Sequence, residues 1–264
     1  MTCIEVSPCL KNEDSESHTL QWLAKQLQFY KPPMVIDDDD EENSDDNSKT
    51  GSHLGLMEVQ NDRQLSCGNW KERRAAVLIC LFEGSETELR VILTKRSMKL
   101  SSHPGDVALP GGKMEEKDVD DSATALREAM EEIGLEPGLV QVVANLEPVI
   151  TQCLLKVVPV VGLLERREDF KPVINTDEVD AIFDVPLEIF LKEDKHRCEE
   201  REWMGWKYML HLFDYETEQG DFLIWGLTAS ILIRAASVIY RRSPSFPGHL
   251  PDFQQLQREM KNPA

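Results

Sequence analysis

The pattern of hydrophobic and polar positions changes abruptly near residue 74. Before it the chain is mostly polar, and after it come apolar runs of strand length separated by turn residues. The first run is continuous, and the next begins after a turn at Gly84, as expected for neighbouring strands of a buried sheet. Val-rich runs follow further along the chain. The expected strands are 75–82, 89–94, 140–150, 155–164 and 179–185.

The last third of the chain combines strands with a helix. Residues 207–215 and 222–225 read as strands joined near Gly220, and 187–191 as a helical turn after Pro186. Residues 199–202 suggest a solvated helix face. A long C-terminal helix is expected from one apolar stripe, formed by Leu227, Ile231, Ala235 and Val238. Mixed strands flanked by helices indicate an α/β fold, with a sheet covered on both faces.

The N-terminal part differs in composition. Leu20, Leu23, Ala24 and Leu27 recur at helical spacing before Pro32-Pro33, which predicts a short helix that docks on the domain or on a partner. Residues 37–52 form an acidic run without apolar anchors, and we expect it to be disordered. The expected organisation is an N-terminal extension at 1–69, one α/β domain at 70–245 and a tail at 246–264.

The candidate metal ligands lie on an acidic helix that is expected to end at Gly134. Glu128, Glu131 and Glu132 stand at i, i+3 and i+4, so their carboxylates share one helical face. Like charges at this spacing repel unless a cation lies between them, and a hard divalent ion such as Mg²⁺ or Mn²⁺ takes oxygen ligands. On the other side, Leu126, Met130 and Ile133 form the stripe expected to be buried.

The residues around these glutamates resemble the box of the Nudix hydrolase family, G-x5-E-x7-R-E-U-x-E-E-x-G-U, where U is aliphatic. The string from Arg127 to Leu135 matches its second half at every specified position. In the first half, Asp118 replaces the glutamate, and the segment from it to Arg127 is one residue longer. The resemblance implies a Nudix fold, an α/β/α sandwich with a loop–helix–loop catalytic motif, and divalent-metal catalysis.

The stretch before the box resembles the signature of Nudix enzymes that cleave coenzyme A, L-L-T-x-R-S-x3-R-x3-G-x3-F-P-G-G. It is matched by Leu93 to Ser97, Gly105 and Pro110 to Gly112, whereas Ser101 replaces an arginine and Leu109 a phenylalanine. This variant is similar to the plant coenzyme A diphosphatases of the family.

Several further residues are candidates for the site. Gly111 and Gly112 permit close backbone approach to a metal shell or a phosphate. Lys95 and Arg96 are candidates for holding substrate phosphates, and Arg127 for orienting a glutamate ligand. Glu178 lies where related enzymes often carry a loop carboxylate that serves as general base or extra ligand; an ordinary polar cap before a strand is the alternative. His103 and the aromatic residues between 203 and 213 are further candidates for substrate contacts, with a solvated loop and a core cluster as the alternatives.

The net charge and the cysteine content exclude some classes of function for this chain. The net charge of −19 argues against a nucleic-acid partner. Six scattered cysteines without zinc-site spacing indicate reduced thiols. No apolar run is long enough to span a membrane, and an acidic N-terminus without an early arginine fits neither a secretory signal nor a transit peptide. A cytoplasmic location is therefore expected, and the oligomeric state is left open.

The expected function is metal-dependent hydrolysis of the diphosphate bond of coenzyme A or acyl-coenzyme A. The products would be adenosine 3′,5′-bisphosphate and 4′-phosphopantetheine or its acyl form. The alternatives are a diphosphatase for ADP-ribose, NADH or oxidised nucleotides, and a catalytically silent nucleotide-binding module whose acidic extension recruits a partner. In each case the ligand is a small nucleotide.

Overall fold

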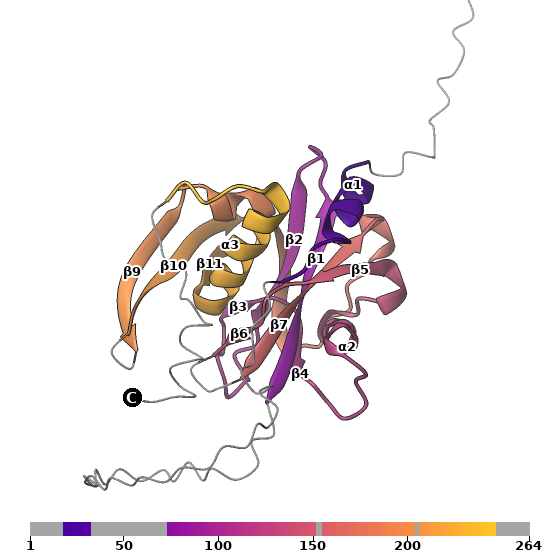
Figure 1. The fold of residues 1–264 in the computed structure, drawn as a ribbon. Helices are drawn as coiled ribbons and strands as arrows, with labels where there is room; N and C mark the ends of the chain where they lie inside the picture. Colours follow the sequence, from indigo (N-terminus) through magenta and orange to yellow (C-terminus); the bar gives the residue numbers. More distant parts are fainter. Residues whose placement is uncertain (1–17, 33–72, 152–154, 204–205, 247–264) are drawn as a thin grey trace, which may run out of the picture.

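A computed structural model describes residues 18–32, 73–151, 155–203 and 206–246. The acidic run at 37–52 and the tail from residue 247 lie outside these ranges, so their expected properties and the domain boundaries remain predictions. Within the described residues, the larger sheet has eight strands, with β3-β2-β1-β7-β5 as its main path (Figure 1). The strands are β1 (Arg74–Glu83), β2 (Leu89–Arg96), β3 (Val107–Ala108), β4 (Gly111–Lys113), β5 (Val140–Asn145), β6 (Val149–Ile150), β7 (Lys156–Leu164) and β8 (Val179–Pro186).

The sheet is mixed, as expected. β1 runs parallel to β7 and antiparallel to both β2 and β4. The single strand expected at 140–150 is divided into β5 and β6. Between them lies Pro148, whose ring removes a backbone donor and fixes φ, so a continuous ladder is disfavoured there.

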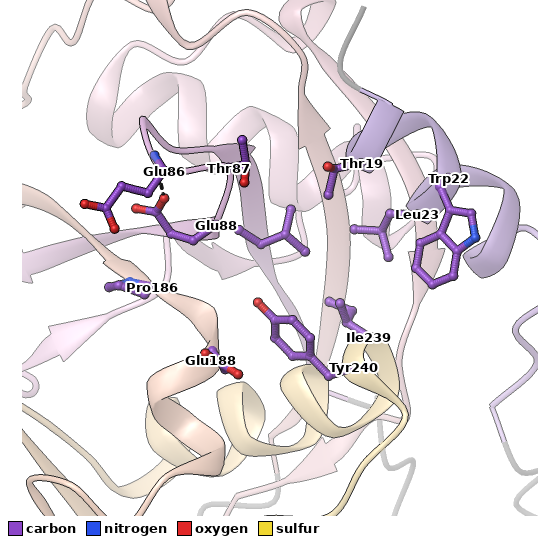
Figure 2. A pocket seen from close by; sticks show the side chains of 11 residues that line it. Thr19, Trp22, Leu23, Glu86, Thr87, Glu88, Pro186, Glu188, Ile239 and Tyr240 are labelled. Atoms are coloured by element: carbon purple, nitrogen blue, oxygen red, sulfur yellow. Dashed lines mark hydrogen bonds between the residues drawn. The ribbon is translucent and has the colours of Figure 1, made fainter.

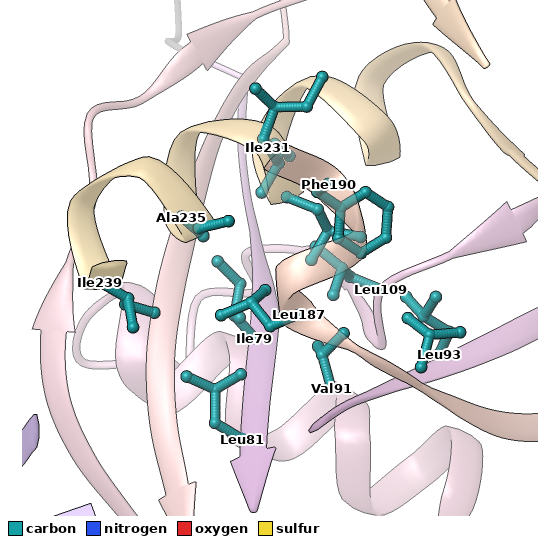
Figure 3. Packing of buried hydrophobic residues seen from close by; sticks show 14 of the residues in the cluster. Ile79, Leu81, Val91, Leu93, Leu109, Leu187, Phe190, Ile231, Ala235 and Ile239 are labelled. Carbon is teal, nitrogen blue, oxygen red and sulfur yellow. The ribbon is translucent and has the colours of Figure 1, made fainter. Parts of the chain in front are cut away.

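Both faces of β1 are buried because successive side chains point to opposite sides of a strand. Ala76, Leu78 and Cys80 belong to the core under α2 (Asp121–Ile133), whereas Ile79 and Leu81 belong to the core under α3 (Gly226–Tyr240). Figure 3 shows the α3 core, in which Ile231 and Ala235 lie over strand residues. The continuous apolar run thus reflects a strand covered by helices on both faces.

The buried stripe of α2 differs from the expected one. Ala125, Ala129 and Ile133 are fully buried, whereas Met130 is 39% exposed. The two alanines have short side chains, which lets the helix backbone approach the sheet closely. Of the predicted stripe, Ile133 is buried and Leu126 packs partly buried against the core, whereas the prediction for Met130 is wrong. The alanines complete the stripe that holds α2 close to β1 and β4.

A second sheet of three strands packs beside the larger one (Figure 1). It consists of β9 (His196–Trp203), β10 (Trp206–Thr217) and β11 (Gly220–Trp225), all antiparallel. Phe183 of β8 stacks on Phe222 of β11 at 3.8 Å between ring centroids, which joins the two sheets. The helix face expected at 199–202 is wrong: these residues belong to an edge strand, where charged side chains discourage further strand pairing.

The short N-terminal helix forms at His18–Leu27 (α1) and docks within the chain. Leu20, Leu23 and Leu27 are each 1% exposed and share the core under α3. The Gln26 amide donates to the carbonyl oxygen of Ile239 at 3.1 Å, so α1 also contacts the end of α3. Although distant in sequence, α1 contributes to the main core.

We expect Leu23→Ala to lower the free energy of unfolding by about 2–5 kcal/mol, because it leaves a cavity in a closed core. Lys25→Ala, on the exposed side of the same helix, is the matched control and should stay within about 0.5 kcal/mol of the wild type. Denaturant unfolding measures both. Equal, small effects would show that α1 is not part of the cooperative core.

Candidate active site

The turn before α2 is built from two glycines that have no room for side chains. Gly111 pairs with Val77 and Gly112 with Ala76 across the β1–β4 ladder. A Cβ on Gly111 would lie 2.4 Å from the carbonyl oxygen of Ala76, and one on Gly112 would lie 2.5 Å from the Glu128 carboxyl group. Glycine at 111 therefore lets β4 lie close against β1, and glycine at 112 lets the Glu128 carboxylate lie directly against the backbone.

The start and end of α2 are fixed by local contacts. The side chain of Asp120 accepts a hydrogen bond from the Ala123 amide at 2.7 Å, which caps the first turn. Arg74 of β1 donates two hydrogen bonds to Asp121, at 2.6 and 2.7 Å. The helix ends at Gly134, whose backbone is left-handed. These contacts hold the helix at a defined position along β1.

Arg127 is the centre of a polar network beside the helix. Its Nε and Nη2 donate to Asp118 at 2.9 and 3.0 Å, and Nη2 also donates to the carbonyl oxygen of Lys113 and to Glu128. Nη1 donates to Glu131 at 2.9 Å. The guanidinium therefore connects the loop, β4 and two of the helix glutamates.

Asp118 is the part of this network for which the sequence suggested no role. Its carboxylate is 4% exposed and also accepts from the Thr124 hydroxyl and the Glu115 amide. The hydrogen bonds from Arg127 hold the pKa of Asp118 well below its usual range. The signal was present in the chain, since Asp118 and Arg127 are the complementary charges at the two ends of the box loop.

Glu128 and Glu132 converge on the glycine turn. Glu132 is 5% exposed and its Oε2 accepts from the Gly111 amide at 3.3 Å. Burial raises the pKa of Glu132 to about 8, and the neighbouring charge of Glu128 adds to the rise. Burial likewise raises the pKa of Glu128, despite the opposing charge of Arg127. The site therefore holds carboxylates at an electrostatic cost.

Glu178 belongs to this cluster although it is distant in sequence. Its charge contributes to the raised pKa values of both Glu128 and Glu132. It immediately precedes β8, and its carbonyl oxygen accepts from the Ser97 amide at 2.8 Å. The charge of Glu178 therefore acts on the two helix carboxylates, although no direct contact joins them in the described residues.

Glu131 lies further out. Its side chain is 48% exposed, and it contacts Arg127 and, at 3.9 Å, the ammonium group of Lys117. The three box glutamates are therefore not equivalent, because two line the turn and the third lies on the outer side of the arginine.

The two basic candidates on β2 lie on different faces. The positive charge of Arg96 opposes the rise in the pKa of Glu132, so its guanidinium is near the carboxylates. Its Nη2 approaches the carbonyl oxygen of Ser102 at 3.4 Å, whereas its buried Nε has no partner. Lys95 pairs across the ladder with Val107, which belongs to the core under α3. Directly paired residues share a face, so Lys95 is not brought to the carboxylates.

Neither His103 nor Phe213 has a hydrogen bond or ion pair with the carboxylates of the cluster in the described part of the structure. His103 is exposed in the loop after β2, where its Nδ1 lies 3.2 Å from Asp106. Phe213 is 1% exposed and belongs to the core, in agreement with the core interpretation. The side chains of Trp203 and Trp206 lie outside the described part of the structure.

The donor set fits a hard divalent cation. Glu128, Glu132 and Glu178 gather like charges that a cation would neutralise, and the glycine turn leaves open backbone beside them. In the described ranges, no three carboxylate, imidazole or thiol groups already enclose a common point. Arg127 contacts Oε1 of Glu128 at 2.9 Å, and the second carboxylate oxygen can serve as the ligand for a cation.

A groove of about 400 Å³ lies elsewhere, between α1, the β1–β2 turn and the end of α3. Figure 2 shows Trp22, Glu88 and Tyr240 around it. None of its lining residues belongs to the carboxylate cluster. The candidate active site is therefore defined by its charged residues and does not coincide with this groove.

Comparison with known proteins identifies the family. Residues 72–225 match the NUDIX domain, which is more than half of the chain. The chain belongs to the Nudix hydrolase family. It is therefore an enzyme with the α/β fold expected from its sequence, and it acts on small-molecule substrates. Nudix hydrolases generally need divalent metal ions.

Three relatives of this Nudix hydrolase are informative. Nudix hydrolase 15, mitochondrial, from Arabidopsis thaliana is 56% identical over 78% of this chain and 72% of that protein. Nudix hydrolase 22, chloroplastic, from the same plant is 50% identical over 94% of this chain and 82% of that protein. Peroxisomal coenzyme A diphosphatase NUDT7 from Mus musculus is 40% identical over 60% of this chain and 67% of that protein.

The expected cytoplasmic location is wrong. The two plant relatives are named mitochondrial and chloroplastic, and neither name indicates the cytoplasm. The expectation rested on the acidic residues near the N-terminus, and that composition did not indicate the compartment. Among the described residues, no helix is both long and apolar enough to cross a membrane.

The raised pKa of Glu132 predicts a pH-dependent stability for the metal-free protein. Below pH 4.5 the carboxyl group is protonated in both the folded and the unfolded chain, and it contributes nothing. Between about 4.5 and 8 the unfolded chain ionises first, so the folded state loses stability as the pH rises. Glu132→Gln removes this loss. It should raise the free energy of unfolding at pH 9 by on the order of 2–4 kcal/mol.

Denaturant unfolding in the presence of a chelator at pH 4 and pH 9 measures this effect. Glu136→Gln, an exposed change just beyond the helix, is the control. An equal effect of Glu132→Gln at both pH values would show that Glu132 is not held in its protonated form.

Proposed function

We propose that this Nudix hydrolase cleaves the diphosphate bond of coenzyme A or acyl-coenzyme A in a reaction that depends on Mg²⁺ or Mn²⁺. The products are adenosine 3′,5′-bisphosphate and 4′-phosphopantetheine or its acyl form. The observation that supports the proposal is the contact of two helix carboxylates with the glycine turn, Glu132 at the Gly111 amide and Glu128 against Gly112. The charges of Glu178 and Arg96 also act on Glu132. Two observations favour coenzyme A as the substrate. The stretch from Leu93 to Gly112 resembles the signature of enzymes that cleave coenzyme A, and the mouse relative is named a coenzyme A diphosphatase.

In this proposal Glu128 and Glu132 hold the divalent ion, with Glu131 as a further ligand candidate. When bound, such an ion neutralises diphosphate oxygens and lowers the pKa of a coordinated water. Glu178 or a box glutamate accepts the proton of the attacking water. The new P–O bond forms as the bridging P–O bond breaks, and the leaving phosphate takes up the negative charge.

The remaining residues bind and orient. The free Nε of Arg96 donates to a phosphate oxygen, since a buried guanidinium donor without a partner is costly. The backbone of Gly111 and Gly112 lies against the reacting groups because neither residue has a side chain. Arg127, held by Asp118, orients Glu128 beside the turn, where its carboxylate would hold a divalent ion.

A second candidate class is supported by one sequence feature. Ser101 stands where the coenzyme A signature has an arginine, and the loss of that cation favours substrates that lack the 3′-phosphate. ADP-ribose, NADH and oxidised nucleotides are such substrates. Family membership makes the chain an enzyme, so the alternative of a catalytically silent binding module is set aside.

The direct test is a comparison of coenzyme A, ADP-ribose and NADH as substrates, with Mg²⁺ or Mn²⁺ and purified full-length protein. Coenzyme A should have the highest kcat/KM. Glu128→Gln and Glu132→Gln should each lower kcat by on the order of 10³, because each removes a charged ligand. Glu136→Gln is the control. Retention of more than about a tenth of the wild-type rate by either variant would remove that residue from the site.

Arg96→Ala tests which phosphate Arg96 contacts. If it binds the 3′-phosphate, kcat/KM for coenzyme A should fall about 10- to 150-fold, as expected for the loss of a charged hydrogen bond. Dephospho-coenzyme A lacks that group and should lose much less. Equal losses would assign Arg96 to the diphosphate. Lys95→Ala, on the opposite face of β2, is the matched comparison, and a selective loss there instead would move the contact to the α3 side.

A further inference from the structure

The loop that carries Glu178 is attached directly to the end of α2. The Val173 amide donates to the carbonyl oxygen of Ile133, and the Asn175 amide donates to that of Glu132, each at 3.0 Å. Carbonyl groups in the last turn of a helix have no donors within the helix. The loop supplies them here, and one of these carbonyls belongs to Glu132 itself.

The other end of the loop is attached to the segment after β2. The Ser97 amide donates to the carbonyl oxygen of Glu178 at 2.8 Å, and the Lys99 ammonium group donates to Asp177 at 2.8 Å. Glu178 therefore stands between two anchors, one on the helix that carries the box glutamates and one beside Arg96.

Asn175 folds the chain between these anchors. Its side-chain Oδ1 accepts from the Asp177 amide at 3.2 Å, which forms an Asx turn. Its carbonyl oxygen accepts from the amides of Glu178 and Val179, at 3.0 and 2.9 Å. The Asx turn is the part of this loop conformation that depends on the Asn175 side chain. It sets the direction of the backbone that leads to Glu178.

We infer that Asn175 is a positioning residue that aligns the Glu178 carboxylate with those of Glu128 and Glu132. The inference rests on the proposed function, in which Glu178 accepts a proton or binds the ion. Asn175 acts through Glu178 and does not touch the substrate. Its loss should therefore lower kcat and leave KM nearly unchanged.

Three variants test the inference on the full-length protein. Asn175→Ala should lower kcat about five- to tenfold, the cost of one lost hydrogen bond, and Asn175→Ser should recover most of it because serine forms the same turn. Thr217→Ala is the matched control: Thr217 Oγ1 accepts from the Gln219 amide at 3.1 Å in the β10–β11 turn, far along the chain. It should keep the wild-type kcat.

A double-mutant cycle distinguishes positioning from general stability. In a Glu178→Gln background, Asn175→Ala should have no further effect on kcat, because the group that it aligns is already lost. An undiminished five- to tenfold loss in that background would overturn the inference. A wild-type rate for Glu178→Gln alone would also overturn it, together with the proposed role of Glu178.

Amide hydrogen exchange of the metal-free protein gives a readout that is independent of activity. The Asp177 and Glu178 amides should exchange faster in Asn175→Ala than in the wild type or Asn175→Ser, with unchanged exchange in β1. Unchanged exchange at both amides would overturn the inference. If ADP-ribose proves to be the substrate in place of coenzyme A, the substrate proposal fails, and the cycle measured with ADP-ribose still decides the role of Asn175.

Discussion

Electrostatic repulsion between carboxylates is the constraint on which the rest of this structure depends. Glu128 and Glu132 lie where burial raises the pKa of both, and the negative charge of Glu178 adds to the rise. A chain gathers such groups only if other interactions hold them in place, because each ionised carboxylate loses solvation and repels its neighbours. Arg127 compensates part of this cost on one side, and the remaining charge is available to a cation.

Packing in the two hydrophobic cores holds the carboxylates in place despite their mutual repulsion. Small residues bring α2 close to the sheet, and Arg74 fixes its first turn to β1. The glycine turn is part of the β1–β4 ladder, so the turn and the helix are both held in fixed positions relative to β1. Well-packed side chains deform little, and repulsion within the site is therefore not relieved by a shift of the helix.

Local sequence patterns were sufficient for much of the fold and for part of the site. The strand runs follow directly from burial, and Ile231 and Ala235 of the C-terminal helix are buried as expected. Leu227 was wrongly expected in the same stripe, because it lies in the first turn of the helix and is 37% exposed. The glutamate spacing pointed to the helix that carries the candidate site. The α2 stripe was assigned in part to the wrong residues because larger apolar side chains were expected in the core, whereas close helix–sheet contact selected Ala125 and Ala129. Cross-strand pairing shows that Lys95 and Arg96 lie on opposite faces of β2. This pairing depends on the register of a neighbouring strand, which a short motif does not specify.

Asp118 shows how two departures from a motif compensate for each other. The segment that separates it from Arg127 is one residue longer than in the family pattern, and its side chain is one methylene shorter than glutamate. Its carboxylate nevertheless receives both Nε and Nη2 of Arg127 and is 4% exposed. The longer loop supplies the reach that the shorter side chain lacks. In this chain the box therefore presents a buried carboxylate to the arginine although its spacing differs from the family pattern.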